Sequence, residues 1–212
     1  MKANIDYSLY LVTDRALMSA ASIEGCVERA ILGGCTVVQL REKDTPSGEF
    51  YAVALRLREI TARYGVPLII NDRADIALAA DADGVHIGQD DLPYSAARRI
   101  VGADKLVGVS VSSLSEAVAA AGAGADYLGV GAMFPTGTKT DGPLTVLDEL
   151  RRIREAVELP IVVIGGINKD TLPRFAGIGI DGAAIVSAIV SQPDETTAAR
   201  GLKAIFEEVC RQ

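Results

Sequence analysis

Residues 127–142 have the sequence YLGVGAMFPTGTKTDG, an apolar beginning followed by a loop that carries several anion-binding groups. The first six residues are apolar or glycine, which is typical of a strand buried on both faces. The loop then offers the hydroxyls of Thr136 and Thr138, the cation of Lys139 and backbone N–H groups. Such groups together can hold an anion. Small residues are equally typical of an ordinary surface turn, so the loop alone leaves both interpretations open.

The motif QLREK offers a second group of cations. It follows an apolar run, and the strand period of two would place Gln39, Arg41 and Lys43 on one side if the strand continues. A pair of cations in this position suits a diphosphate. The alternative is that Arg41 and Lys43 form ordinary salt bridges with Glu42 or Asp44. We favour ligand binding because both cations follow a buried strand.

Carboxylates follow the next two apolar runs. Asn71 and Asp72 end the motif IIND, and Asp90 and Asp91 end the motif GQDD. Neighbouring parallel strands would bring these ends together, and two carboxylates without a nearby histidine suit a hard cation. The pattern therefore predicts Mg²⁺ bound by Asp72, Asp91 and a diphosphate. Asp72 and Asp91 could instead cap helices, and we assign that role to Asp90.

Two later segments suggest a phosphate site. The motif IGG contains Gly165 and Gly166, and the motif IVS contains Val186 and Ser187. Glycines there would let backbone N–H groups approach phosphate oxygens, although they could also form a simple turn into a helix. Ser110 ends another apolar run, where it would face the same region or only cap a helix.

The only histidine, His86, lies inside an apolar run. We predict a packed, hydrogen-bonded core residue there rather than a catalyst. The sequence contains nothing that resembles a Ser/His/Asp or Cys/His catalytic arrangement.

The elements that must position these residues alternate between short apolar runs and longer helical patterns, which predicts βα units and a parallel sheet. Strands are predicted at 9–13, 36–41, 67–72, 84–87, 106–110, 127–131, 161–165 and 182–186. Helices are predicted at 22–33, 48–64, 74–80, 94–101, 113–122, 144–157, 170–176 and 195–211. Ser22, Ser113 with Glu116, and Asp194 are helix start signals.

Eight such units without a linker predict an α/β fold, a closed (β/α)8 TIM barrel that forms one domain over residues 1–212. The chain of 212 residues is short for such a barrel, which usually takes about 250. A doubly wound open sheet is the alternative. No G-x-G-x-x-G motif opens a helix, however, and polar motifs follow strands throughout the chain. In a barrel, all of these strand ends gather at one face.

The composition narrows the classes of function. With 49% apolar residues the chain can bury a substantial core, and its net charge of −7 argues against binding nucleic acid or an anionic membrane. The three cysteines, Cys26, Cys35 and Cys210, lack metal-ligand spacing. No apolar run reaches the roughly 18 to 20 residues of a membrane span, and the beginning of the chain is a poor signal peptide. We expect a soluble, cytoplasmic protein. Whether it forms a homo-oligomer is left open by the sequence.

The motifs QLREKD, IIND, GVHIGQDDL, GVGAMFPTGTKTD and IVVIGGI occur in this order over nearly the whole chain and resemble the thiamine-phosphate synthase family. The resemblance implies a (β/α)8 barrel that joins 4-amino-2-methyl-5-(diphosphooxymethyl)pyrimidine to a thiazole phosphate. The products would be thiamine phosphate and diphosphate, with Mg²⁺ as the cofactor. In bacteria of this family the thiazole often arrives as a carboxylated tautomer.

The resemblance also implies roles for individual residues. Gln39, Leu40, Arg41, Glu42, Lys43, Asn71, Ser110 and Lys139 would hold the pyrimidine diphosphate. Asp72 and Asp91 would be the magnesium ligands, and Thr136, Thr138, Gly166, Val186 and Ser187 would hold the thiazole phosphate. In the dissociative chemistry of the family, Arg41, Lys43, Lys139 and Ser110 would act on the departing diphosphate.

Two alternatives remain beside this one. A thiazole tautomerase relative shares the barrel and phosphate site but has no diphosphate to hold, so Asp72, Asp91 and Lys139 argue against it. A non-catalytic barrel that binds thiazole phosphate would have no use for a magnesium pair.

Overall fold

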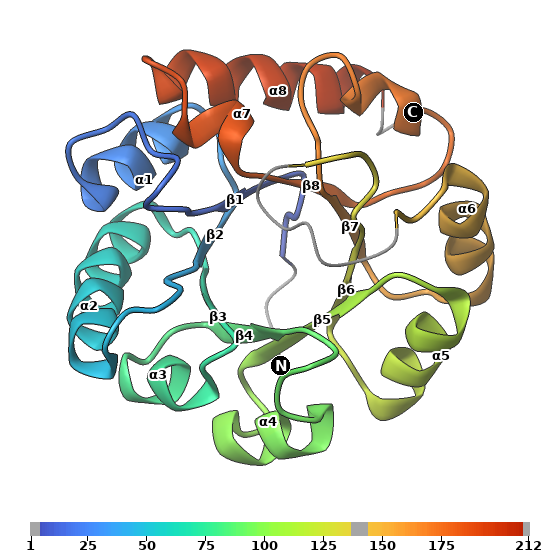
Figure 1. Cartoon of the computed structure of the whole chain (residues 1–212), viewed down its shortest axis with the longest axis horizontal. Helices are drawn as coiled ribbons and strands as arrows, with labels where there is room; N and C mark the ends of the chain where they lie inside the picture. Colours follow the sequence, from blue (N-terminus) through green and yellow to red (C-terminus); the bar gives the residue numbers. More distant parts are fainter. Residues whose placement is uncertain (1–4, 137–143, 210–212) are drawn as a thin grey trace.

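The computed structural model describes residues 5–136 and 144–209 of the chain, and its strands close into a barrel in sequence order (Figure 1). All neighbouring strands are parallel, and β1 pairs with β8 to complete the ring. The strands are β1 (Leu9–Val12), β2 (Val37–Leu40), β3 (Leu68–Asn71), β4 (Gly84–Ile87), β5 (Leu106–Val111), β6 (Tyr127–Val130), β7 (Ile161–Ile164) and β8 (Gly182–Ile185). The predicted single-domain (β/α)8 barrel is confirmed.

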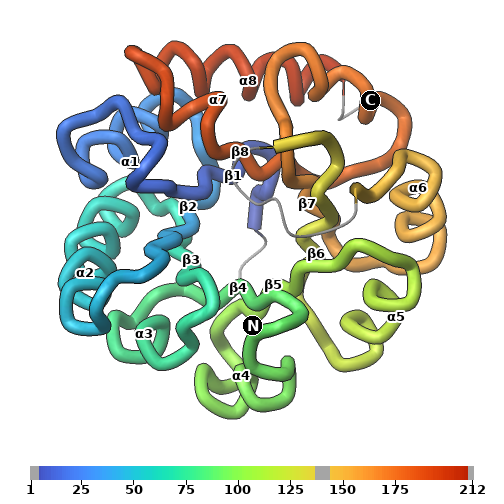
Figure 2. The backbone as a smooth tube through the Cα atoms, viewed as in Figure 1, coloured from blue at the N-terminus to red at the C-terminus, as the bar shows by residue number. Residues whose placement is uncertain are grey.

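Helices surround this barrel, and the chain circles it once so that its first and last units lie side by side (Figure 2). The helices are α1 (Ile23–Leu32), α2 (Ser47–Tyr64), α3 (Ala74–Ala79), α4 (Tyr94–Val101), α5 (Leu114–Ala123), α6 (Leu147–Ala156), η1 (Leu172–Phe175), α7 (Ser187–Val190) and α8 (Glu195–Val209). Most strands have only four residues, which explains how a chain of this length completes the fold.

Three helices differ from the sequence prediction. The helix predicted from residue 144 begins only at Leu147, and the segment predicted at 170–176 is the short 3-10 helix η1. Pro173 lies in the first turn of η1, where its missing N–H costs nothing. The sequence prediction missed α7, because four residues are too few to show a helical period.

The predicted helix start signals are confirmed. The hydroxyl of Ser22 accepts a hydrogen bond from the Gly25 N–H, and that of Ser113 accepts one from the Glu116 N–H. Asp194 likewise accepts from the N–H of Thr197 at the start of α8. The Glu116 carboxylate bonds the N–H of Ser112, one residue before the cap, so the capping box is shifted by one position.

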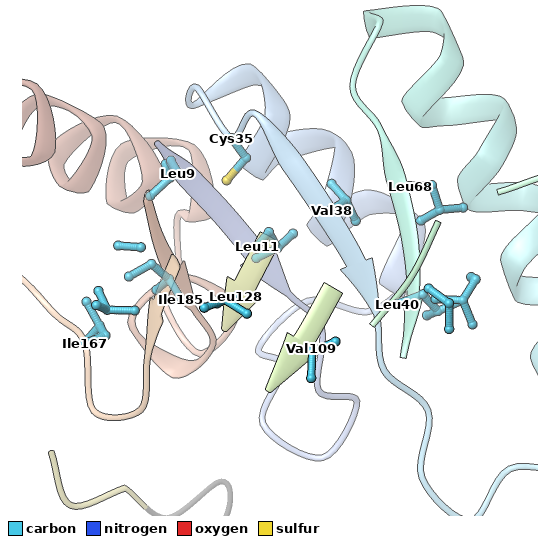
Figure 3. Close-up of a cluster of buried hydrophobic side chains, with 14 of the residues drawn as sticks. Leu9, Leu11, Cys35, Val38, Leu40, Leu68, Val109, Leu128, Ile167 and Ile185 are labelled. Atoms are coloured by element: carbon cyan, nitrogen blue, oxygen red, sulfur yellow. The ribbon is translucent and has the colours of Figure 1, made fainter. Parts of the chain in front are cut away.

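The core has an inner and an outer part because successive strand residues point to opposite sides of the barrel wall. Leu9 and Leu11 of β1 belong to the outer core between strands and helices, part of which is shown in Figure 3. Tyr10 and Val12 of the same strand belong to the inner cluster, which lies inside the barrel. The four-residue strands are therefore buried on both faces, as their continuous apolar runs predicted.

An ion pair joins the last helix to the first. Glu195, at the start of α8, is 1% exposed, and its carboxylate accepts hydrogen bonds from Arg29 Nε at 2.8 Å and Nη2 at 3.1 Å. Gly33 lies at the end of α1 beside it, where a Cβ atom would come within 2.5 Å of the Thr196 carbonyl oxygen. The close approach of the two helices and the bidentate pair together hold the ring closed.

We expect Glu195→Gln to lower the free energy of unfolding at neutral pH by about 1.5–3 kcal/mol, the range for hydrogen bonds to charged groups. The hydrogen bonds from Arg29 lower the pKa of Glu195 below its ordinary value. The stabilisation is therefore complete above about pH 4.3, the unfolded value, and is lost as pH falls through the folded value. Urea unfolding of both proteins across this pH range measures the difference.

Asp148→Asn is the matched control, because it breaks the pair between Asp148 and Arg151 at the surface, where both side chains are exposed. It should leave stability nearly unchanged. Equal losses from the two variants, or a Glu195→Gln loss that persists in acid, would contradict the closing role of Glu195.

Cys26 and Cys35 are buried free thiols, and burial raises the pKa of Cys26 to about 12. Cys210 lies outside the described residues. Within residues 5–136 and 144–209, no helix is long and apolar enough to cross a membrane.

Candidate active site

A cavity of about 500 Å³ lies inside the barrel and reaches the loops that follow the strands. Most of the residues singled out in the sequence line it, although they come from seven different strands or the loops after them. These residues are Gln39, Arg41, Lys43, Asn71, Asp72, Asp91, Ser110, Thr136, Gly166, Val186 and Ser187. Thr138 and Lys139 lie outside the described residues, so the structure does not address their predicted roles.

The alternation predicted for QLREK places Gln39, Arg41 and Lys43 at the cavity. Arg41 Nη1 donates to Asp14 Oδ2 at 2.8 Å, so its partner comes from the loop after β1 rather than from Glu42 or Asp44. The Arg41 side chain is only 15% exposed, the pair with Asp14 fixes its position, and the residue borders the cavity.

The residues between these positions turn away from the cavity. Leu40 is fully buried in the outer core, where Figure 3 labels it at the end of β2. The Glu42 side chain is 1% exposed and accepts hydrogen bonds from Arg15 Nε at 3.1 Å and Thr45 Oγ1 at 3.1 Å. Only the backbones of Leu40 and Glu42 are left to meet a ligand, and such contacts stay predictions. The Glu42 side chain instead ties the loop after β2 to the loop after β1.

Asp72 and Asp91 form a close carboxylate pair at the cavity wall. Asp72 has a left-handed backbone, with φ at 63°, and its N–H donates to the His86 carbonyl at 2.8 Å. Asp91 Oδ2 accepts from the Gly88 N–H at 2.6 Å. Burial, followed by the neighbouring Asp91 carboxyl, raises the pKa of Asp72 to about 6. Two carboxylates held this way repel each other unless a proton or a cation lies between them.

Helix capping does not explain these acids. The N-cap residues of α3 and α4 are Arg73 and Pro93, and neither helix has a side-chain cap. The capping role assigned to Asp90 is therefore wrong: Asp90 is exposed and borders the cavity.

The glycines after β7 are required by the backbone. Gly165 and Gly166 have φ values of 94° and 67°, in the left-handed region that side chains disfavour. A Cβ atom at Gly166 would come within 2.7 Å of the Phe134 Cβ. The two glycines therefore form a turn, which is one of the two roles predicted from the sequence. This turn packs closely against the loop after β6. Both glycines also line the cavity, so the predicted phosphate role stays open.

The floor of the cavity is polar and was not predicted as part of the site. Tyr10, Tyr127 and His86 line it, and all three side chains are buried. Their hydrogen bonds form a continuous chain from Gln39 to Ser110. His86 is the packed, hydrogen-bonded residue that the sequence predicted, but it also borders the cavity. Tyr10 could have been identified from its position in LYLV, because the strand period of two places it on the same side as Val12, facing the inside of the barrel.

Three comparisons place the chain among known proteins. The family model described as "Thiamine monophosphate synthase" matches residues 9–189. The thiamine-phosphate synthase of Clostridium beijerinckii is 60% identical over 99% of this chain and 100% of its own length. That of Clostridium botulinum is 56% identical over 99% of this chain and 98% of its own length. The solved thiamine phosphate pyrophosphorylase of Pyrococcus furiosus is 41% identical and superposes with a TM-score of 0.89 over 96% of each chain. The chain therefore belongs to the thiamine-phosphate synthase family of transferase enzymes.

Proposed function

We propose that the cavity joins the pyrimidine diphosphate to a thiazole phosphate and releases thiamine phosphate and diphosphate. The observation that carries this proposal is the meeting of Arg41 and Lys43 with Asp72 and Asp91 in one cavity. In a chain with a net charge of −7, two cations held beside two carboxylates form a local site for an anion and a metal together. A thiazole tautomerase would have no diphosphate for these groups to hold.

The carboxylate pair fits magnesium. No cluster of three or more His, Cys, Asp or Glu side chains suited to a metal occurs in the part of the chain that the structure describes. Mg²⁺ is commonly bound by only one or two carboxylates, with water and phosphate oxygens in its other positions. Burial, followed by the neighbouring Asp91 carboxyl, raises the pKa of Asp72, and a bound cation would offset both effects. Asp72 and Asp91 would hold the ion, which would supply positive charge to the departing diphosphate.

The protein's own groups would stabilise the same charge. Arg41, held by Asp14, presents a fixed cation, and Lys43 lies near enough to Asp72 to lower its pKa, against the dominant upward effect of burial. Ser110, Asn71 and Gln39 add polar contacts around the same space. In this dissociative reaction the amino group of the pyrimidine expels the diphosphate and the thiazole nitrogen traps the resulting cation. Preorganised charge and close positioning of the two rings then provide the rate enhancement.

The proposed phosphate site for the thiazole lies across the cavity. Gly166 follows β7, whereas Val186 and Ser187 begin α7 after β8, and Thr136 follows β6. The loops after the seventh and eighth strands are where barrels of this type commonly bind phosphate. Apolar side chains of Val12, Val162 and Ile164 also line the cavity, where a ring can pack against them.

The purified protein, given both substrates and Mg²⁺, should release diphosphate and form thiamine phosphate. Product is measured by chromatography and diphosphate by a coupled assay. A chain that converted the thiazole phosphate without releasing diphosphate would be a tautomerase, and one that bound it unchanged would be a binding protein. Either result would reject the proposed synthase reaction.

A further inference from the structure

The hydrogen-bond chain on the cavity floor crosses five strands of the barrel. Gln39 Nε2 donates to Tyr10 Oη at 2.8 Å, and Tyr10 Oη lies 2.8 Å from Tyr127 Oη. Tyr127 Oη lies 3.0 Å from His86 Nδ1, and His86 Nε2 lies 2.8 Å from Ser110 Oγ. Gln39 and Ser110, at its two ends, both border the cavity. Each of the interior groups has one neighbour on either side along the chain.

Each tyrosine hydroxyl has a single proton to donate, so the bonds in this chain are not independent. Burial raises the pKa of both Tyr10 and Tyr127, and each therefore keeps its proton. Tyr10 accepts from Gln39, and its own proton must then go to Tyr127. Tyr127 in turn must donate to His86 Nδ1. With Gln39 as the donor, any other arrangement leaves a buried hydroxyl proton without an acceptor, which is unfavourable.

The direction of the chain decides the state of its far end. If His86 Nδ1 accepts from Tyr127, the ring proton lies on Nε2, which then donates to Ser110 Oγ. Ser110 Oγ then accepts from His86, and its own hydroxyl proton can point at a cavity ligand. The reverse direction would require Gln39 to turn its oxygen toward Tyr10, and Ser110 would then donate to His86.

We propose that Tyr10, Tyr127 and His86 are positioning residues that fix His86 as the Nε2–H tautomer and present Ser110 to the cavity as a hydrogen-bond donor. A donor at this position suits a phosphate oxygen, which can only accept. The hydrogen bond from Ser110 to a substrate phosphate rests on the proposed function, whereas the tautomer of His86 does not. In this arrangement Tyr10, Tyr127 and His86 are all uncharged, so Ser110 can donate to an anion without a buried charge beneath it.

The sequence makes the tautomer directly measurable, because His86 is the only histidine. The protein labelled with ¹⁵N-histidine gives one pair of ring nitrogen signals, and a protonated nitrogen has a very different chemical shift from an unprotonated one. Without substrates, we expect protonated Nε2 and unprotonated Nδ1, assigned by their couplings to the ring hydrogens. A proton on Nδ1, or on both nitrogens, would overturn the proposal. The synthase assay is separate, so failure of either proposal can be recognised alone.

Gln39→Glu tests the direction itself. An ionised carboxylate can only accept, so Tyr10 would donate to it, and each following bond would reverse. The ring proton should move from Nε2 to Nδ1, with exchange of the two ¹⁵N signal types. The measurement is made above about pH 8, where Arg41 and Lys43, which border the same cavity, favour the ionised carboxylate. An unchanged tautomer would show that Gln39 does not set the direction and would overturn the proposed coupling.

Tyr7→Phe is the matched control. The Tyr7 ring lies 4.9 Å from the Tyr127 ring and is 6% exposed, but its hydroxyl takes no part in the chain from Gln39 to Ser110. It should leave the tautomer on Nε2. If Tyr7→Phe reversed the ring signals as Gln39→Glu does, general packing of the floor would control the tautomer, and the one-way chain would be wrong.

Discussion

Replacing Asp72 by asparagine should lower the kcat of thiamine phosphate formation by about 10²- to 10³-fold, the effect of removing one preorganised electrostatic contact. Asparagine is the informative substitution because it removes the charge and still tolerates the left-handed backbone of Asp72, with φ at 63°. Alanine at the same position would add backbone strain to the loss of charge. Asp91→Asn should have a similar effect, although it also weakens the bond from the Gly88 N–H.

Magnesium titration separates metal binding from other losses. If Asp72 and Asp91 hold the ion, each variant should need more Mg²⁺ to reach its own maximal rate, and thermal unfolding should show that the fold is intact. Asp90→Asn is the control, since Asp90 borders the same cavity but is exposed. It should change the rate by no more than about twofold, as expected of a screened surface charge. Normal rates for Asp72→Asn and Asp91→Asn at limiting magnesium would reject the metal assignment.

The sequence was sufficient for the barrel because the residues that build it are continuous apolar runs. A run such as VVQL, buried on both faces, differs plainly from the amphipathic helix that follows it. The position of several charged side chains at the cavity was also predictable, because residues directly after the strands of a barrel gather at one face. Arg41, Asp72 and Asp91 all line the cavity for this reason. The alternation of strand residues also distinguishes Arg41 and Lys43, which line the cavity, from Leu40 and Glu42, which do not.

The floor could not be predicted in the same way. Tyr10 and Tyr127 lie within buried strands, where an aromatic residue is ordinary core, and nothing in the sequence indicates that their hydroxyls meet. Their contact depends on the stagger of strands that are 117 residues apart in the chain. The role of Asp90 was wrong for a related reason. Asp90 lies shortly before α4 in the sequence, but the backbone places Pro93, and not Asp90, at the N-cap of that helix.

Glycines inside strands provide the missing signal for the floor. Gly108 of β5 lies beneath the Tyr127 ring, and a Cβ atom there would lie 2.1 Å from Tyr127 Cζ. Gly129 of β6 likewise leaves room for His86, because an added Cβ atom would lie 2.8 Å from the His86 ring. Glycine in a strand weakens it unless another group needs the space. The pattern LVGVS therefore indicates a large inward side chain on a neighbouring strand.

Gly108→Ala should consequently lower the free energy of unfolding by about 3 kcal/mol, at the upper end of the usual cost of overpacking. The Tyr127 ring is fully buried, and its packing against the rings of Tyr7, Tyr10 and His86, at centroid distances of 4.9, 6.0 and 5.4 Å, restricts its movement. Chemical denaturation measures the loss. Gly122→Ala is the control: it lies in α5 with no atom within 4 Å of the added Cβ. It should stabilise the protein by about 0.5–1 kcal/mol.

A double-mutant cycle shows whether the Tyr127 ring is the cause. Tyr127→Ala alone should destabilise the barrel by about 3–5 kcal/mol, because it leaves a cavity in the inner core. With that ring removed, the added methyl group of Gly108→Ala has room, and the second substitution should cost little or should stabilise. The two effects are then strongly non-additive, as expected of groups in direct contact. Additive losses would mean that Gly108 is needed for its own backbone and not for the space it leaves to Tyr127. The floor would then be held in place by some other feature of the barrel.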